Sequence, residues 1–549
     1  MNQHDLHEVA YPALDDAQMD RIAQCGCASP RSYQAGQTLF QAGERDCEFF
    51  VIRSGEVEIL DPSGDTPKTL VIHRAGSFTG EVPNLTGSPS LVTAVARTGC
   101  DVLAVASSAL QELLNRCPEL SDLVLQAYLA RRQLLRESGS FTGLRVIGSR
   151  YSQDTFRIRD FLARNRAPFT WLDLEADPQV SQLLQQFGLS EKDTPVVAWG
   201  RLLLLRNPSN RQLAEAMGVR RPIEAAVYDL VVVGAGPAGL AAAVYGASEG
   251  LRTIVLERTA PGGQAGSSMR IENYLGFPTG ITGSELADRA TIQADKFGAR
   301  LSIPAPVVGL TFEHGYPILR LDTGETVTTR SVLIATGADY RRLDVEGCSR
   351  FEGCGVYYAA TPNEAQLCKG SDVVVVGGGN SAGQAAVFLA QQSRAVYLVI
   401  RGDSLDRNMS SYLARRIERT PNIEVLVNTT AQRMIGDRSL RAVEILDSET
   451  GARRTLGVAA LFSFIGAEPR TDWLPPAIEK DARGFVRTGA EGRRAPSWDR
   501  RREPFLLETS HPGVFAAGDV RAGSIKRVAS AVGEGAMTIK LVHELLKER

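Results

Sequence analysis

Two glycine-rich loops constrain the fold of this chain more than any other feature. Each loop follows an apolar run with the length of a buried parallel strand, Tyr228–Val233 in the first copy and Asp372–Val376 in the second. A glycine turn between such a strand and a helix leaves backbone N–H groups free to bind phosphate. The sequence therefore predicts two nucleotide-binding βαβ units in one chain.

The first loop, residues 234–239, has the glycine spacing that a dinucleotide requires. Gly234 permits the tight turn, Gly236 lets the backbone approach a pyrophosphate, and Gly239 allows the helix to pack closely on the strand. The next predicted strand, 253–256, ends at Glu257, where an acid accepts hydrogen bonds from ribose hydroxyls. Together these features predict a complete dinucleotide site.

The second loop, residues 377–382, repeats this pattern, but the strand that follows it ends differently. The strand predicted at 396–400 leads into Arg401. A carboxylate there would repel a 2′-phosphate, whereas a guanidinium pairs with it. The second site is therefore predicted to prefer NADPH to NADH, with Arg407 as a second contact. The alternative is an Arg401 that only caps its strand in solvent.

Further motifs connect these two units to a known family. The tripeptide at 335–337 ends a third strand, and a Gly-Asp pair at 518–519 ends another. The stretches 261–264 and 272–278 resemble the flavin-contacting stretch of thioredoxin reductase. From Tyr228 onward the chain thus resembles thioredoxin reductase. The resemblance implies FAD in the first site, NADPH in the second, and a homodimer. The loops and this resemblance together assign cofactor binding to Gly234, Gly236, Pro237, Ala238, Gly239, Glu257, Gly263, Gln264, Asn273, Thr336, Gly337, Gly518, Asp519, Arg527, Val528, Gly377, Gly379, Asn380, Ser381, Ala382, Arg401 and Arg407.

One motif of that family is altered at its chemically essential positions. Thioredoxin reductase carries Gly-Val-x-Tyr-Cys-Ala-Thr-Cys-Asp before the second loop, and here residues 355–363 read Gly-Val-Tyr-Tyr-Ala-Ala-Thr-Pro-Asn. Ala359 and Pro362 offer neither a nucleophile nor an electron reservoir, so no internal dithiol relay is expected and no catalytic side chain is assigned. Cys354 and Cys368 flank the motif and are expected to be plain thiols, with a substitute redox pair as the alternative.

The N-terminal part reads as short strands broken by glycines, from about Tyr33 to Val105, with apolar periodic stretches on either side. It resembles a cyclic-nucleotide-binding domain, including the start of a phosphate cassette at Gly80 and Glu81. In that family the cassette acid binds the ribose, and an arginine after a proline pairs with the cyclic phosphate. Here Ser90 follows Pro89, so we expect a degenerate domain, with a working cAMP or cGMP sensor as the alternative.

The middle of the chain resembles a thioredoxin or glutaredoxin fold. A strand at 144–147, a helix at 153–165, a second strand at 169–174 and Thr194-Pro195 before another strand carry this resemblance. The family's cysteine pair would fall near 149–154, which reads Ser-Arg-Tyr-Ser-Gln-Asp. Without a thiolate no disulfide exchange occurs there, so a spacer or docking role is predicted.

The 549 residues are too many for one core, so several domains are expected. We predict a cyclic-nucleotide-binding-like β-roll with helices at 1–136 and an α/β thioredoxin-like domain at 141–220. A Rossmann-like FAD domain follows at 226–341 with 472–549, and a Rossmann-like NADP domain at 342–471.

Composition narrows the partners and the compartment. Lys plus Arg (61) nearly balances Asp plus Glu (63), which argues against nucleic acid or an anionic membrane as a partner. The arginines at 493–494 and 500–502 are a local exception, read as a solvated loop or as a basic docking patch. Eight cysteines lack a C-x-x-C, and the C-x-C of Cys25 and Cys27 has no further ligands nearby, so no metal is expected. A cytoplasmic location is predicted.

These features favour an NADPH-dependent FAD oxidoreductase that passes electrons from reduced flavin to an external acceptor, either a small molecule or a small redox protein. Two alternatives stay open. One is a thioredoxin-disulfide reductase that uses other cysteines, and the other is a flavin- or nucleotide-based redox sensor with the front domain as its signal input.

Overall fold

The structure is a computed structural model that describes residues 3–45, 47–62, 66–80, 89–137, 144–177, 180–199, 203–224, 226–494, 498 and 502–548. The chain forms two compact units. The first contains Met1–Gly148, Asn165–Glu224 and Ile292–Pro304, and the second contains Ser149–Arg164, Ala225–Thr291 and Ala305–Arg549. The predicted multidomain class is confirmed, with an N-terminal β domain and a C-terminal pair of Rossmann-type folds.

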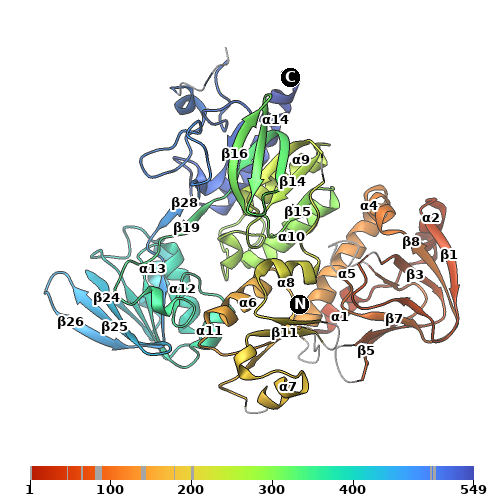
Figure 1. Ribbon diagram of the computed structural model, residues 1–549, viewed down its shortest axis with the longest axis horizontal. Helices are drawn as coiled ribbons and strands as arrows, with labels where there is room; N and C mark the ends of the chain where they lie inside the picture. Colours follow the sequence, from red (N-terminus) through yellow and green to blue (C-terminus); the bar gives the residue numbers. More distant parts are fainter. Residues whose placement is uncertain are drawn as a thin grey trace. The chain divides into compact units, whose positions relative to one another are not determined.

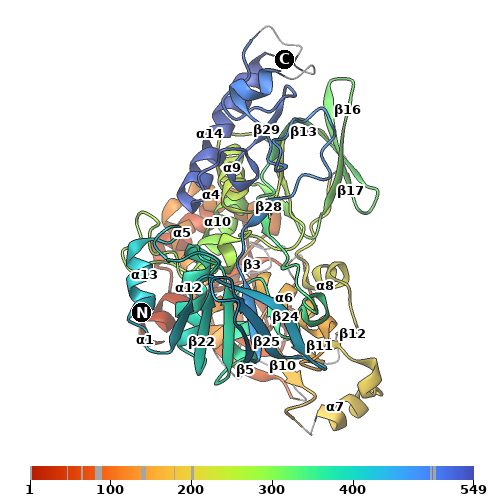
Figure 2. The same cartoon turned by 90° about the vertical axis from the view of Figure 1, so that its left-hand side faces the viewer.

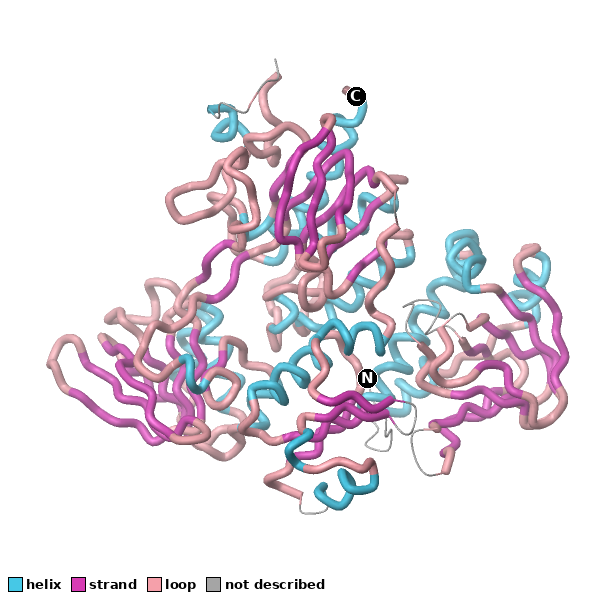
Figure 3. The backbone as a smooth tube through the Cα atoms, viewed as in Figure 1, coloured by secondary structure: helices cyan, strands magenta, loops and turns pink. Residues whose placement is uncertain are grey.

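Two four-stranded antiparallel sheets form the N-terminal β-roll, with strand orders β1-β8-β3-β6 and β2-β7-β4-β5 (Figure 3). The inward faces of β3 and β8 pack with helical residues such as Leu110 and Val124, which are almost fully buried. The strands are β1 (Ala28–Tyr33), β2 (Thr38–Phe40), β3 (Phe49–Ser54), β4 (Val57–Asp61), β5 (Lys68–His73), β6 (Phe78–Thr79), β7 (Thr93–Ala96) and β8 (Cys100–Val105). The helices are α1 (Gln3–Ala10), α2 (Asp16–Gln24), α4 (Ser107–Arg116) and α5 (Pro118–Glu137).

The first unit also contains a four-stranded mixed sheet of order β10-β9-β11-β12, in which only β9 and β10 run parallel. Its strands are β9 (Leu144–Gly148), β10 (Phe169–Asp173), β11 (Val196–Trp199) and β12 (Leu203–Arg206). A cis peptide bond joins Thr194 to Pro195 just before β11. The helical segments that follow in this unit are α7 (Val180–Gln186), η1 (Glu191–Asp193) and α8 (Asn210–Met217).

In the second unit, β14-β13-β18-β29 form a parallel sheet, and β17 and β16 extend it as an antiparallel meander (Figure 1). The strands are β13 (Tyr228–Val233), β14 (Thr253–Leu256), β16 (Val307–Glu313), β17 (Tyr316–Leu321), β18 (Thr326–Ile334) and β29 (Val514–Ala516), and β15 (Arg300–Ser302) lies between α10 and β16 in sequence. Helices α9 (Pro237–Ser248) and α14 (Val528–Lys547) pack side by side, and α10 spans Gly283–Lys296. Their close contact requires Gly535, where an added Cβ would lie 2.1 Å from the Ala238 carbonyl oxygen.

A five-stranded parallel sheet of order β20-β27-β21-β22-β23 forms the second nucleotide fold. Helices α12 and α13 pack against it, which buries Leu389 and Leu413 with Val396 (Figure 2). The strands are β20 (Val356–Tyr357), β21 (Asp372–Val376), β22 (Ala395–Val399), β23 (Ile423–Leu426) and β27 (Ala460–Ser463), and the helices are α11 (Pro362–Leu367), α12 (Asn380–Ala390) and α13 (Ser411–Glu418). An antiparallel sheet of β24 (Thr429–Gly436), β25 (Leu440–Asp447) and β26 (Arg453–Gly457) and a ribbon of β19 (Ala338–Tyr340) and β28 (Ala467–Pro469) accompany it.

Short 3₁₀ helices occupy some of the connections: η2 (Ala265–Ser267), η3 (Ser349–Phe351), η4 (Gly489–Arg494) and η5 (Gly518–Val520). Within the described part of the chain, no helix combines the length and the apolar character needed to cross a membrane.

Candidate functional site

A cavity of about 1290 Å³ in the second unit brings both glycine loops to one space. Nearly all of the residues that the sequence assigned to cofactor binding line it. They are Gly234, Gly236, Pro237, Ala238, Glu257, Gly263, Gln264, Asn273, Thr336, Gly337, Gly377, Gly379, Asn380, Ser381, Ala382, Arg401, Gly518, Asp519, Arg527 and Val528. Gly239 and Arg407 are the two assigned residues that do not line its wall.

The first loop is a cradle that only glycine can form. Gly234 has a φ of +105°, and a Cβ there would lie 2.4 Å from the Ala335 carbonyl oxygen. A Cβ at Gly239 would lie 1.9 Å from the Gly234 carbonyl oxygen, so Gly239 serves the packing of α9 on β13 rather than the wall. The loop thus places the N-terminus of α9 at the cavity wall, where the helix dipole favours an anion.

Glu257 is fixed at the end of β14 by the backbone around it. Its carboxylate accepts hydrogen bonds from the N–H groups of Ala235 at 2.7 Å and Thr259 at 2.8 Å. The acid thus braces the glycine loop while it faces the cavity, which is the geometry expected of a ribose-binding carboxylate.

The segment that leads into α14 forms another part of the cavity wall. The Gly518 N–H donates to the Glu534 carboxylate at 2.7 Å, and α14 begins at Val528 with Arg527 as its N-cap. Burial raises the pKa of Asp519, which lines the cavity beside this second helix N-terminus. The Thr336 hydroxyl donates to the Arg470 carbonyl oxygen at 3.1 Å and closes the wall opposite.

The second loop repeats the first in its backbone geometry. Gly377 has a φ of +143°, and a Cβ there would lie 2.4 Å from the Phe464 carbonyl oxygen. Helix α12 starts at Asn380, whose side-chain oxygen accepts from the Ser410 N–H at 2.8 Å. The Tyr340 hydroxyl donates to Ser381 Oγ at 3.2 Å, so a residue of β19 contacts the second loop.

The two candidate 2′-phosphate arginines have different surroundings. Arg401 follows β22, which ends one residue earlier than predicted, and it is exposed at the cavity wall. Arg407 lies outside that wall, and its guanidinium pairs with Asp403 at 2.9 Å. Of the two arginines, only Arg401 faces the cavity.

Several lining residues escaped sequence reasoning. Arg164, Tyr340, Arg470 and Trp473 face the same cavity, and none of them belongs to a glycine motif. They come from segments far apart in the sequence, so no local spacing could have identified them. An arginine near the end of α6 (Gln153–Arg164) reaches the wall because that helix is part of the second unit.

Two glycine turns, each leading into a helix N-terminus at the cavity wall, and a braced acid beside the first turn fit two dinucleotides, because a helix N-terminus favours a bound pyrophosphate. The fold and the site together define a flavoprotein oxidoreductase with separate sites for two nucleotides. Residues 228–535 match the pyridine nucleotide-disulphide oxidoreductase family, and residues 30–117 match the cyclic nucleotide-binding domain. The chain belongs to the pyridine nucleotide-disulphide oxidoreductase family and is of its thioredoxin reductase type.

Known relatives cover the second unit's nucleotide folds. Thioredoxin reductase of Treponema pallidum is 37% identical over 311 residues, which are 56% of this chain and 94% of the relative. The crystal structure of Lactococcus lactis thioredoxin reductase in its FR conformation matches with a TM-score of 0.53 at 27% identity, covering 59% of this chain and 100% of that one. The T. acidophilum thioredoxin reductase structure matches with a TM-score of 0.52 at 30% identity, covering 58% and 98%. The cofactors of this family are FAD and NADPH, as expected, and the protein is an NADPH-dependent flavoprotein oxidoreductase.

Ala359 and Pro362 stand at the two positions where the sequence motif of thioredoxin reductase has cysteines. Ala359 precedes α11, and the exposed Pro362 begins it. Cys354 and Cys368 are buried thiols that are not bonded to each other. Burial raises the pKa of the Cys354 thiol and raises the pKa of Cys368 to about 12. Both thiols stay protonated at neutral pH and are therefore poor nucleophiles.

The first unit contains a disulfide that the sequence analysis did not predict. Cys25 and Cys27 form the C-x-C at which no metal was expected, and their sulfurs are joined to each other. The intervening residue, Gly26, has a φ of +71°, and this turn brings the two side chains together. The C-x-C spacing alone does not predict a turn that brings the two sulfurs together.

Helix α6 and the residues before it pack beside the missing dithiol. The Cys354 thiol donates to the Tyr151 carbonyl oxygen at 3.2 Å, and the Phe156 and Tyr357 rings have centroids 5.5 Å apart. A Cβ at Gly353 would lie 3.1 Å from the Phe156 ring, so glycine makes room for it. Residues of the thioredoxin-like sequence region thus complete the core around β20 and α11.

The first unit contains a smaller cavity of about 160 Å³. Pro89 and Ser90 line it, and the Ser90 hydroxyl donates to the Val92 carbonyl oxygen at 2.8 Å. Arg131 and His73 also line it, and burial, aided by the charge of Arg131, lowers the pKa of His73 to about 3. The predicted cassette acid Glu81 lies outside the described residues.

Proposed function

We propose that the protein transfers electrons from NADPH, through FAD, directly to an external acceptor, without the dithiol that its relatives carry near the second loop. The observation that supports this proposal is the replacement of both reactive positions by Ala359 and Pro362. The nearest cysteines do not substitute for them, because burial raises the pKa of Cys354 and of Cys368 and keeps both as thiols.

In this proposal the first cradle holds FAD and the second holds NADPH. The α9 N-terminus and Gly236 would face the FAD pyrophosphate, and Glu257 would accept from its ribose. Gly379 and the α12 N-terminus would face the pyrophosphate of NADPH, and Arg401 its 2′-phosphate. The bound pair supplies hydride transfer from nicotinamide to flavin, while the chain orients both rings in one cavity.

An anaerobic titration tests the direct route. Purified protein is reduced with one equivalent of NADPH, and the flavin absorbance is followed while quinone, ferredoxin or thioredoxin disulfide is added in separate runs. We expect rapid reoxidation by a quinone or a one-electron protein, and none by thioredoxin disulfide. Pretreatment with iodoacetamide should leave turnover unchanged, because no thiol takes part. Thioredoxin reduction at a rate comparable to quinone reduction would refute the proposal.

The second candidate is a thioredoxin-disulfide reductase that uses other cysteines. The observation that favours it is the Cys25–Cys27 disulfide, because its reduction would give the chain a dithiol. The variant Cys25→Ser separates the two functions. If NADPH turnover survives this substitution, the direct route is supported. If NADPH turnover disappears, the second candidate is supported.

For the front domain we propose that it binds cyclic nucleotides weakly or not at all. Ser90 stands where its family places an arginine, and the Ser90 side chain is used within the fold. A charge-assisted bond to phosphate contributes about 1.5–3 kcal/mol, so its absence weakens binding ten-fold or more. Calorimetry with cAMP and cGMP should show weak or no binding, and Ser90→Arg should strengthen it. Tight binding by the unaltered protein would contradict this.

A further inference from the structure

Cys25 and Cys27 lie where helix α2 ends and strand β1 begins. Cys25 is the C-cap of α2, and β1 starts at Ala28. Their sulfurs are joined across a single residue, Gly26, in a turn that uses the left-handed conformation glycine adopts without strain. The disulfide therefore forms a very small ring at a helix-to-strand turn.

This ring contributes little to holding the fold together. A disulfide stabilises a protein largely by closing a loop in the unfolded chain, and that effect grows with the length of the loop. Cys25 and Cys27 are only 2 positions apart, so the bond constrains little beyond its own turn. Helix α2 is already fixed by the buried side chain of Ile22 and by a capping box at Asp15. A structural reason for the disulfide is therefore missing.

The disulfide lies in a turn that is partly exposed to solvent. Cys25 and Cys27 are each half-buried, and Gly26 between them is exposed. Thiol–disulfide exchange requires a thiolate to reach one sulfur in line with the bond, and the exposed Gly26 leaves one side of this turn uncovered. The other described cysteines of this unit do not share this setting, since Cys47 and Cys100 are buried and Cys117 has no paired cysteine.

The turn has hydrogen-bond partners for both oxidation states. The Cys27 N–H donates to Cys25 Sγ at 3.3 Å, and the Ile22 carbonyl oxygen lies 2.9 Å from the same sulfur. The Ile22 carbonyl oxygen is therefore placed to accept an S–H from Cys25 when the bond is reduced. Neither form requires the neighbouring helix or strand to unfold, which is what a reversible pair needs.

From these observations we infer that Cys25 and Cys27 form a redox-active pair that dithiols reduce. A thiolate of the dithiol attacks one sulfur and forms a mixed disulfide, and the other sulfur leaves as a thiolate and takes up a proton. The second thiolate of the reductant then attacks the mixed disulfide. The chain gains two electrons and two protons, and the reductant leaves as its own disulfide.

Thiol trapping on the full-length flavoprotein tests this inference. The protein is equilibrated anaerobically with reduced and oxidised dithiothreitol at a series of ratios, quenched in acid, and alkylated with N-ethylmaleimide. Trypsin releases residues 22–31 as one peptide, which holds both cysteines. We expect this peptide to change from unlabelled to doubly labelled in a single two-electron transition, without a singly labelled form accumulating.

Variants separate a redox pair from ordinary thiols. In Cys25→Ser and in Cys27→Ser the remaining cysteine should be labelled at every ratio. Cys117→Ser, which removes a half-buried free thiol of the same unit, should keep the transition unchanged. A doubly labelled peptide from the air-oxidised protein would overturn the inference. So would a disulfide that dithiothreitol reduces only after denaturant has unfolded the chain.

Discussion

Arg401 and Arg407 follow the same strand of the second nucleotide fold, yet only Arg401 faces the cavity. Arg407 is already paired with Asp403. A guanidinium that binds a 2′-phosphate contributes about 1.5–3 kcal/mol, which corresponds to ten-fold or more in affinity. We therefore expect Arg401→Ala to raise the KM for NADPH at least ten-fold and to leave the KM for NADH unchanged. Arg407→Ala is the matched control and should alter neither; equal losses for both nucleotides in Arg401→Ala would remove the case for NADPH.

The residues of the site divide into those that local spacing predicts and those that it does not. Gly234, Gly377 and Glu257 were predictable, because a turn, a backbone approach and a strand end each require a particular residue type. Tyr340 and Arg470 were not, because they enter the cavity from β19 and from beyond β28 only after the chain has folded. Sequence reasoning identifies residues that serve the backbone better than residues that arrive through tertiary contacts.

At the scale of elements, the packing of α9 on β13 depends on the absence of a side chain at Gly239. A Cβ at Gly239 would lie 1.9 Å from the Gly234 carbonyl oxygen, and backbone cannot move away as a side chain can. Gly239→Ala should displace α9, cost roughly 1–3 kcal/mol or more, and release FAD. Flavin absorbance after gel filtration measures the loss. Gly533→Ala in α14, where nothing lies within 4 Å, should keep its flavin.

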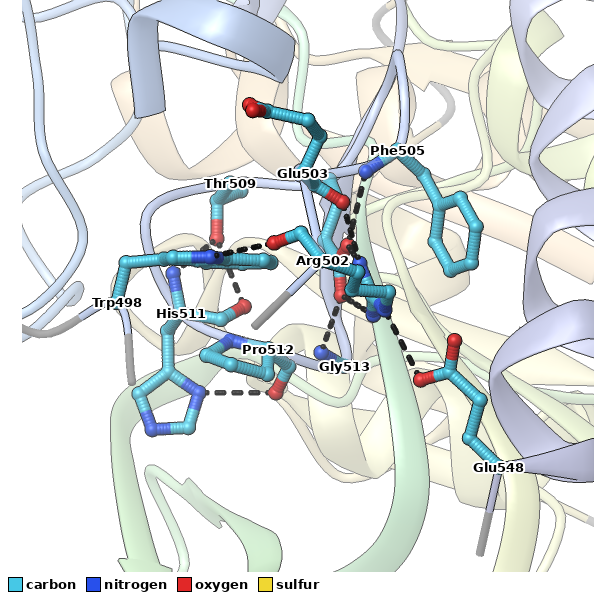
Figure 4. Close-up of polar contacts among 10 residues, drawn as sticks. Trp498, Arg502, Glu503, Phe505, Thr509, His511, Pro512, Gly513 and Glu548 are labelled. Atoms are coloured by element: carbon cyan, nitrogen blue, oxygen red, sulfur yellow. Dashed lines mark hydrogen bonds and ion pairs between the residues drawn. The ribbon is translucent and has the colours of Figure 1, made fainter. Parts of the chain in front are cut away.

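The loop before β29 is tied to the end of α14 by a partly buried ion-pair network (Figure 4). Arg502 pairs with Glu508 at 2.7 Å and with Glu548 at 2.9 Å, and the Glu508 side chain is fully buried. The Phe505 and Gly513 N–H groups also donate to Glu508. Arg502, the one residue of the run at 500–502 that the structure describes, thus pairs with a buried carboxylate instead of being fully solvated.

Removing Arg502 leaves the Glu508 carboxylate buried with its main charge partner gone. Losing one partner of a buried pair costs about 3–5 kcal/mol, so Arg502→Ala should lower the unfolding midpoint in urea markedly. The control is Lys540→Ala, which breaks an exposed pair with Glu544 on α14. That change should cost less than about 0.5 kcal/mol. Equal effects of the two substitutions would show that the network contributes nothing special.

At the scale of the whole molecule, acid should destabilise the first unit before the second. His73 is neutral in the folded state because its pKa is lowered to about 3. In the unfolded chain its pKa is about 6.5, so the unfolded state binds an extra proton below that pH. The stability that neutral His73 contributes to the first unit is fully present above about pH 6.5, and it is lost as the pH falls toward 3. At about pH 5 the loss is roughly 2 kcal/mol.

Pulsed hydrogen exchange during urea unfolding, read on peptides of β3 and β8, measures this loss at about pH 7.5 and about pH 5. His73→Phe should flatten the pH dependence of the first unit. Substitution of the exposed His7 in the same unit, as His7→Gln, should not. An unchanged slope in His73→Phe would show that other groups cause the acid sensitivity.

Much of the architecture was predictable because apolar runs and glycine turns fix local structure. Strands β13, β14 and β21 begin and end where the sequence indicated. The meander of β16 and β17 and the sheet of β24, β25 and β26 were not predicted, because half-exposed antiparallel strands carry a weak signal without a motif. The sequence also could not predict that α6 belongs to the second unit, because this depends on tertiary contacts such as that of Phe156 with Tyr357.

The membership of α6 has a practical consequence for anyone dividing this chain. The backbone passes from the first unit to the second at residue 149 and returns at residue 165. A fragment cut at the linker before Tyr228 would keep both nucleotide folds yet lose the Phe156 side chain that fills the space over Gly353. The second unit of this chain therefore includes α6, which comes from the sequence in front of Tyr228.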